Sequence, residues 1–129
     1  MSAPDTEDGV SVHLTDCGHE DAGAVFGALE AAFPEGAGPP RSELRPGAAG
    51  VEHPMVWCMT IDLSTRGAPL RAIPVPLAGP VTADLFGAAD LVRRVRKQLA
   101  AVFEVEERGH VSGEHEMELR LRLTSGREE

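Results

Sequence analysis

The sequence predicts an α+β fold with two layers, a mainly antiparallel sheet with two helices on one face. Three observations lead to this prediction. Several short segments alternate apolar and polar residues, and two longer segments repeat apolar residues at helical spacing. The C-terminal third complements itself as a hairpin. Segments with one apolar face each are most simply buried by packing the helices against one side of a sheet.

The chain has 129 residues, which predicts one domain over residues 9–124. A chain of this length buries roughly two-thirds of its unfolded surface and needs no metal or disulfide to fold. Residues 1–8 are polar, so we expect a disordered N-terminal tail, and residues 125–129 are expected to fray. We find no internal repeat in the sequence.

The first two elements are a strand and a helix. Val10, Val12 and Leu14 alternate with polar residues and predict a strand. Residues 20–33 carry apolar side chains on one helical stripe, and Asp16 is a candidate cap for this helix. Pro34 ends the helix because proline cannot continue it.

The middle of the chain alternates between irregular and extended segments. Residues 34–54 contain five prolines and four glycines and predict a mobile surface loop. Residues 55–63 alternate as a strand, with Trp57 in the core. Residues 70–77 form at most an edge strand because prolines interrupt them, whereas residues 80–86 predict a regular strand.

The second helix is predicted over residues 88–102, where one arc is apolar and the opposite arc is basic. A hairpin follows, closed over residues 112–114. Its predicted register places complementary charges opposite each other on one face. The pairs are Glu104 with Arg122, Glu106 with Arg120, Arg108 with Glu118, and His110 with Glu116. Glu107 falls on the apolar face of this register, so we expect a β-bulge or a strand edge there.

The predicted order is therefore β-α-β-β-α-β-β. This order is similar to ferredoxin-like folds with an added strand, which here forms the C-terminal hairpin. The similarity concerns architecture only, because such folds support many unrelated functions.

Composition disfavours several classes of partner. The formal net charge is -9, with 21 acidic and 12 basic residues, which opposes binding to nucleic acid or to an anionic membrane. No apolar run approaches the roughly 20 residues of a membrane helix, and the first residues lack the pattern of a secretory signal. We therefore expect a cytoplasmic protein. The one basic cluster lies on the second helix and consists of Arg93, Arg94, Arg96 and Lys97.

Cys17 is the first candidate for chemistry because it precedes a helix, whose N-terminus favours thiolate. His19 and His13 are candidate bases beside it. Neighbouring acidic residues oppose the thiolate, and there is no second cysteine at Cys-x-x-Cys spacing. A structural cysteine is the competing interpretation, and we assign no catalytic residue.

A zinc site is the second chemical candidate. The residues that offer suitable ligands are His13, Cys17, His19, His53 and Cys58. Their spacing lacks the close ligand pairs of structural zinc sites, so we expect neither a metal nor another cofactor.

The outer side of the first helix offers the clearest sign of a partner. Its small residues are Gly23, Ala24, Gly27, Ala28 and Ala31. Small side chains permit close approach of another chain, although alanine is also a good helix former. The leading hypothesis is a non-catalytic interaction or regulatory module that forms a homodimer or binds another protein. The alternative is a small cysteine-dependent enzyme or zinc sensor centred on Cys17 and His19.

Overall fold

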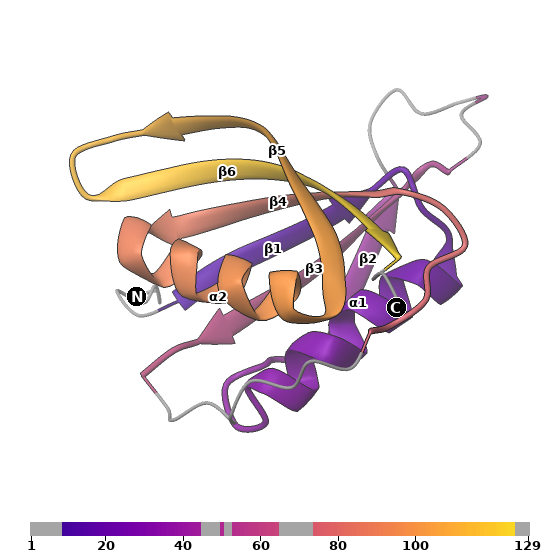
Figure 1. Cartoon of the computed structure of the whole chain (residues 1–129), viewed down its shortest axis with the longest axis horizontal. Helices are drawn as coiled ribbons and strands as arrows, with labels where there is room; N and C mark the ends of the chain where they lie inside the picture. Colours follow the sequence, from indigo (N-terminus) through magenta and orange to yellow (C-terminus); the bar gives the residue numbers. More distant parts are fainter. Residues whose placement is uncertain (1–8, 45–49, 51–52, 65–73, 126–129) are drawn as a thin grey trace.

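The computed structural model describes residues 9–44, 50, 53–64 and 74–125 and has an α+β fold with one open antiparallel sheet (Figure 1). Six strands form the sheet, and two helices pack on one of its faces. The strands are β1 (Gly9–Thr15), β2 (Arg41–Leu44), β3 (Met55–Asp62), β4 (Val81–Ala88), β5 (Phe103–Ser112) and β6 (Glu116–Ser125). The helices are α1 (His19–Ala32) and α2 (Ala89–Val102).

The strand order is β2-β3-β1-β4-β6-β5, so the predicted ferredoxin-like order is wrong. All neighbouring strands are antiparallel. In the first half, β1, α1 and β2 make a crossover, and β3 returns between β1 and β2. In the second half, β4, α2 and β5 make the same crossover, and β6 returns between β4 and β5. The fold therefore contains two β-α-β-β units that meet at the β1–β4 pair.

This structural repeat extends to the packing of the helices. Both helices have 14 residues, so their positions correspond one to one from their first residues, His19 and Ala89. Three corresponding pairs are buried in both helices: Ala22 with Val92, Val25 with Val95, and Leu29 with Leu99. The two sequences share little else, because only the positions that face the sheet must be apolar.

The core lies between the helices and the inner face of the sheet. Alternate residues of the central strands point into it, including Val10, Val12 and Leu14 of β1, all fully buried. Leu121 and Leu123 of β6 are also fully buried. Each such side chain contributes about 1.5–3 kcal/mol relative to an exposed position. The alternation predicted for these strands is thus the source of the fold's stability.

The C-terminal hairpin is present, but its register differs from the predicted one. Glu106 lies opposite Arg122 rather than Arg120, and the latter lies opposite Gly109. A register shift between Glu107 and Gly109 confirms the bulge expected at this position. None of the four predicted charge pairs is in register.

Ion pairs with other elements accompany the observed register. Arg120 contacts Asp84 of β4 through two nitrogen–oxygen distances of 2.9 and 3.3 Å. Glu107 reaches α2, where its carboxylate lies 2.9 Å from the Nε atom of Arg96. The β4 partner is in place because β4 lies beside β6 in the sheet. Arg120 thus forms its ion pair with a residue of β4, a strand that is distant in the sequence, and not with a residue of β5.

Segment 34–54 contains a strand where we predicted only a loop. β2 pairs with β3, and before it Gly38 donates to the carbonyl of Thr60 at 2.9 Å. The mobility predicted for this segment stays a prediction. Residues 74–77 form no strand, and the rest of the predicted edge strand 70–77 lies outside the described residues. Ser125 belongs to β6 and exchanges two hydrogen bonds with Leu77, so fraying does not begin there.

The predicted N-terminal tail 1–8 and residues 126–129 of the predicted C-terminal tail 125–129 lie outside the described residues. Within the described part of the chain, no helix is long and apolar enough to cross a membrane. This agrees with the sequence, in which no apolar run of the required length occurs.

Gly87 lies opposite Val10 in the β1–β4 pair, and its replacement tests the packing of this central pair. A Cβ atom at Gly87 would lie 2.7 Å from the carbonyl oxygen of Gly9. We expect Gly87→Ala to destabilise the fold by about 1–3 kcal/mol, as overpacking does elsewhere. Urea unfolding measures this change. Gly109→Ala is the matched control, because a Cβ atom there meets nothing within 4 Å. Equal stability of the two variants would contradict the central packing described here.

Candidate functional site

A groove separates α1 from the edge strand β2. Its volume is about 420 Å³. One wall is a stripe along α1, the other is the start of β2, and an indole of β3 lies between them. The main lining residues are His19, Gly23, Phe26 and Gly27 from α1, Arg41 and Ser42 from β2, and Trp57 from β3.

Gly23 and Gly27 leave the helical wall of this groove bare. Neither glycine has a left-handed φ angle, and a Cβ atom at either position would meet nothing within 4 Å. In a helix interior each glycine costs about 0.5–1 kcal/mol relative to alanine. The corresponding positions of α2 are Arg93 and Lys97, which are exposed. Neither the backbone conformation nor the packing of the described residues therefore requires glycine there.

Aromatic side chains form the floor of the groove. The prediction that Trp57 belongs to the core is only partly met, because the side chain is half-buried and packs against the core from outside. Its indole N–H lies 3.4 Å from the carbonyl oxygen of Cys17 and donates to it. The ring of His19 meets the indole edge to face, with centroids 5.7 Å apart. These contacts hold the floor in place without filling the groove.

The five small residues predicted as an interface do not share one surface. Gly23 and Gly27 line the groove, whereas Ala28 packs against the core. Ala24 is half-buried, and Ala31 is exposed outside the groove. Of the five predicted residues, Gly23 and Gly27 are the two that line the described groove.

A second hollow, of about 560 Å³, lies at the junction between β1 and α1. Asp16 has a φ angle of 63° there and accepts a hydrogen bond from the Thr82 hydroxyl at 2.9 Å. The prediction that Asp16 caps α1 is wrong, because the N-cap residue of this helix is Gly18. The carboxylate of Asp21 accepts backbone hydrogen bonds from Ala78 at 2.8 Å and from the next residue at 3.1 Å. This hollow is thus tied together by the chain's own polar groups.

Cys17 lies in this second hollow but is poorly suited to act as a nucleophile. Its side chain is 3% exposed. Burial, followed by the charges of Asp21 and Asp16, raises the pKa of the Cys17 thiol to about 11. The thiol is therefore protonated at neutral pH, and the helix N-terminus does not overcome these effects. A raised thiol pKa is unfavourable for the cysteine-dependent alternative, which stays a hypothesis that alkylation can test.

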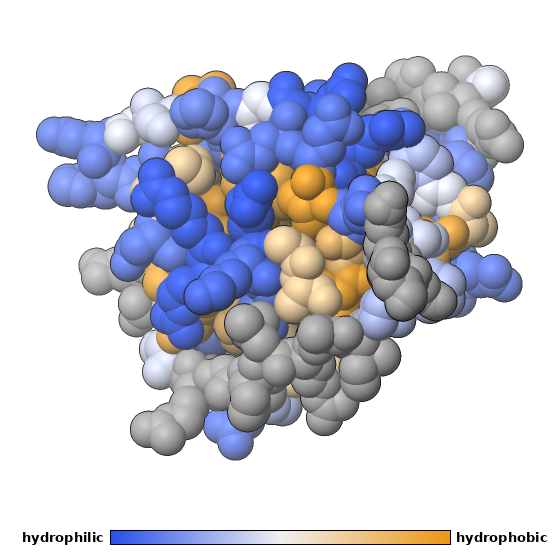
Figure 2. All heavy atoms as spheres, viewed as in Figure 1, coloured by the Kyte–Doolittle hydropathy of each residue, from blue (hydrophilic) through white to orange (hydrophobic). Residues whose placement is uncertain are grey.

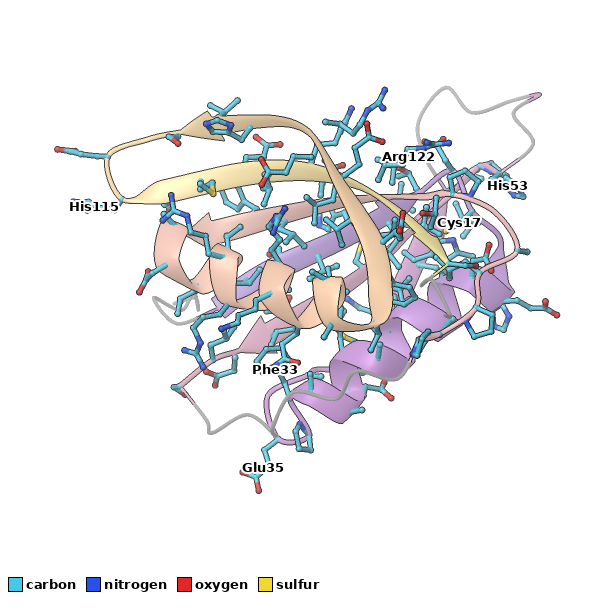
Figure 3. All side chains as sticks on the ribbon, in the orientation of Figure 1. Cys17, Phe33, Glu35, His53, His115 and Arg122 are labelled. Carbon is cyan, nitrogen blue, oxygen red and sulfur yellow. The ribbon has the colours of Figure 1, made fainter. Side chains whose placement is uncertain are left out.

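The five candidate zinc ligands fall into two groups. Cys17, His19 and His53 all line the second hollow, and Figure 3 places Cys17 and His53 at the same end of the molecule. His13 and Cys58 are cross-strand neighbours on the face of the sheet that the helices leave open. Among the described residues, no three His, Cys, Asp or Glu side chains are arranged to hold a metal ion.

The basic cluster of α2 remains at the surface. Arg93, Arg94 and Lys97 are exposed, whereas Arg96 is half-buried beside Glu107. Figure 2 shows hydrophilic residues over the outer side of α2, with apolar atoms toward its C-terminal end. The cluster presents positive charge on an otherwise acidic protein, without an adjoining cavity among those described here.

Sequence reasoning missed the groove because it missed β2. The segment Arg-Ser-Glu-Leu at residues 41–44 has no apolar alternation, and all four residues are exposed. The two prolines before it are its only sequence signal, since proline is tolerated at sheet edges. Comparisons with protein-family models, curated proteins and solved structures find no match for this chain.

Alkylation tests the protonation state of Cys17. With a thiol pKa of about 11 instead of 9.0, the thiolate fraction at pH 8 falls about 100-fold, so iodoacetamide labelling should slow at least that much. Labelling should accelerate about tenfold per pH unit until the pH approaches 11, as long as the fold persists. Peptide mass spectrometry measures the rate, with the urea-unfolded chain as control. Fast labelling of native Cys17 at pH 7 would restore the nucleophile hypothesis.

Proposed function

We propose that this protein is a non-catalytic interaction module that self-associates through the side of the molecule formed by α1 and β2. The observation that carries this proposal is the empty space in front of Gly23 and Gly27. These glycines weaken the helix, and, apart from the adjoining helix backbone, no side chain or backbone atom of the described residues lies within 4 Å of the space that a Cβ atom would take there. A partner that enters the groove would use it.

The composition of the groove fits a protein partner. Interfaces are enriched in aromatic residues and arginine and are often rimmed by polar groups. The groove has Trp57 and Phe26 below, and Glu30 and Ser42 among its polar lining residues. It also adjoins an edge strand whose outer side is not paired in the sheet. An incoming chain would therefore meet both an apolar surface and backbone groups able to form hydrogen bonds.

The second half of the fold offers an internal comparison. Where α1 carries glycines, α2 carries Arg93 and Lys97, and α2 also contacts its edge strand through Arg96 and Glu107. The second β-α-β-β unit thus has the same architecture as the first without glycines in its helix, and its edge strand β5 is bound to α2. Among the described residues, the groove with its two glycines belongs to the first unit, and such a difference between the units fits a dedicated contact surface.

Filling the groove should separate stability from association. Gly27→Leu places a good helix former where a Cβ atom has free space, so the free energy of unfolding should stay equal or rise by up to about 1 kcal/mol. The leucine side chain would occupy the groove, and self-association should weaken at least tenfold. Urea unfolding and sedimentation equilibrium measure the two effects.

Ala31→Leu is the matched control for this experiment. It adds a leucine to an exposed position of the same helix outside the groove, so association should not change. A wild-type protein that remains monomeric at its highest soluble concentration would contradict the proposed self-association. A wild-type oligomer that Gly27→Leu leaves intact would exclude the groove as its contact surface.

A further inference from the structure

We infer that two copies of this chain join through their β2 strands, paired antiparallel about a twofold axis at Ser42. The inference rests on the proposed self-association and specifies its partner and register. In this register Arg41 lies opposite Glu43 of the second copy, and Leu44 lies opposite Pro40 of the second copy. The two sheets would become one sheet of twice the width.

The outer edge of β2 has backbone groups directed away from its own sheet. Before β2, Gly38 donates to Thr60 and Asp62 donates to Gly36, at 2.9 and 2.8 Å. The N–H and C=O groups of successive residues in a strand point to alternate sides. Thr60 and Asp62 bond toward the β2 side, so the other even-numbered residues of β3 also direct their N–H and C=O groups toward β2. Arg41 lies opposite Cys58 and so bonds inward, which leaves the N–H and C=O groups of Ser42 directed outward. Two copies of Ser42 can then bond reciprocally at the axis.

The charges of β2 are complementary to themselves in this register. Arg41 and Glu43 are two residues apart, so both side chains lie on the open face of the sheet. Antiparallel pairing about Ser42 brings each guanidinium opposite a carboxylate of the other copy, twice per dimer. Cross-strand pairs of opposite charge stabilise a sheet, and like charges opposite each other destabilise it. A shift by one residue would lose both pairs.

The apolar contacts on the other face agree with the same register. Leu44 is 67% exposed, one of few large apolar side chains at the surface of the described residues. It shares the helix side of the sheet with Ser42, which lines the groove. In the dimer Leu44 reaches Pro40 of the second copy, which also lines its groove. In the dimer, the exposed Leu44 of each copy would therefore be covered by the second copy, beside the groove of that copy.

The opposite edge of the sheet is less suitable for such pairing. β5 contains the bulge between Glu107 and Gly109, which interrupts a regular ladder. Arg108 on this edge already contacts Glu106 of its own strand at 3.3 Å. A bulge is one of the devices that keep an edge strand from pairing. β2 has a regular register over its four paired residues and is thus the better edge for a second copy.

Charge reversal tests the register directly. Arg41→Glu alone and Glu43→Arg alone should each weaken the dimer at least tenfold, because each places like charges opposite each other twice. An equimolar mixture of the two variants should form a mixed dimer of near wild-type affinity, since both cross-strand pairs are then complementary. The double variant R41E/E43R should dimerise by itself for the same reason. Native mass spectrometry distinguishes the mixed dimer by its mass.

The control is Arg93→Glu, which makes the same charge change on the exposed side of α2 and should leave the dimer unaffected. Urea unfolding of each variant verifies the fold. If the wild type dimerises but the mixture does not recover affinity, the register is overturned while the proposed self-association stands. If the single reversals leave the dimer intact, β2 is excluded as the contact. A monomeric wild type overturns both proposals.

Discussion

The limited width of the helical layer is the constraint on which the rest of the structure depends. Six strands at about 4.8 Å spacing span about 24 Å between the outer strand axes, before their side chains are counted. Two helices of about 10 Å diameter cover about 20 Å of this width. The central strands β1 and β4 are covered completely, and their inward residues are fully buried. One or both sheet edges must therefore be covered by something else or remain open.

The two units of the repeat resolve this shortfall differently. In the second unit β5 lies against α2, and the contact between Arg96 and Glu107 joins the helix to the edge strand. In the first unit α1 presents Gly23 and Gly27 toward β2, and a groove remains. The buried positions of the helices correspond while these outer positions do not. The difference between the units is thus confined to the surface, where the fold imposes little.

The sequence carries the apolar pattern of the fold but not its pairing. Both helices and five of the six strands follow from the spacing of apolar residues, because burial on one face decides them locally. The hairpin register was mispredicted because charges alternate along both strands and several registers match them. Arg120 decides between these registers by contacting Asp84, a residue 36 positions away that only the assembled sheet brings close. Strand order likewise depends on nonlocal contacts, so the repeat was invisible in the sequence.

The candidate site was only half visible for a related reason. Gly23 and Gly27 were identifiable as small residues on one side of a helix, but the opposite wall belongs to β2, which lacks an apolar pattern. Trp57 was expected to be wholly interior because aromatic residues in alternating strands usually are. It is half-buried because the groove beside Gly23 and Gly27 leaves the indole uncovered on its outer side. The alternating pattern of β3 does not reveal this, because the cover of a strand depends on which helix residues face it.

The proposed dimer would also solve the problem of exposed sheet edges. A twofold interface is closed, since each copy uses the same strand and no further copy can add there. The joined sheet would then end on both sides in β5, where the bulge after Glu107 interrupts the ladder. The two prolines before Arg41 limit the pairing region of β2 to a few residues, because proline cannot donate to a ladder. A short pairing segment needs additional contacts to hold, and the groove beside it supplies the apolar surface for them.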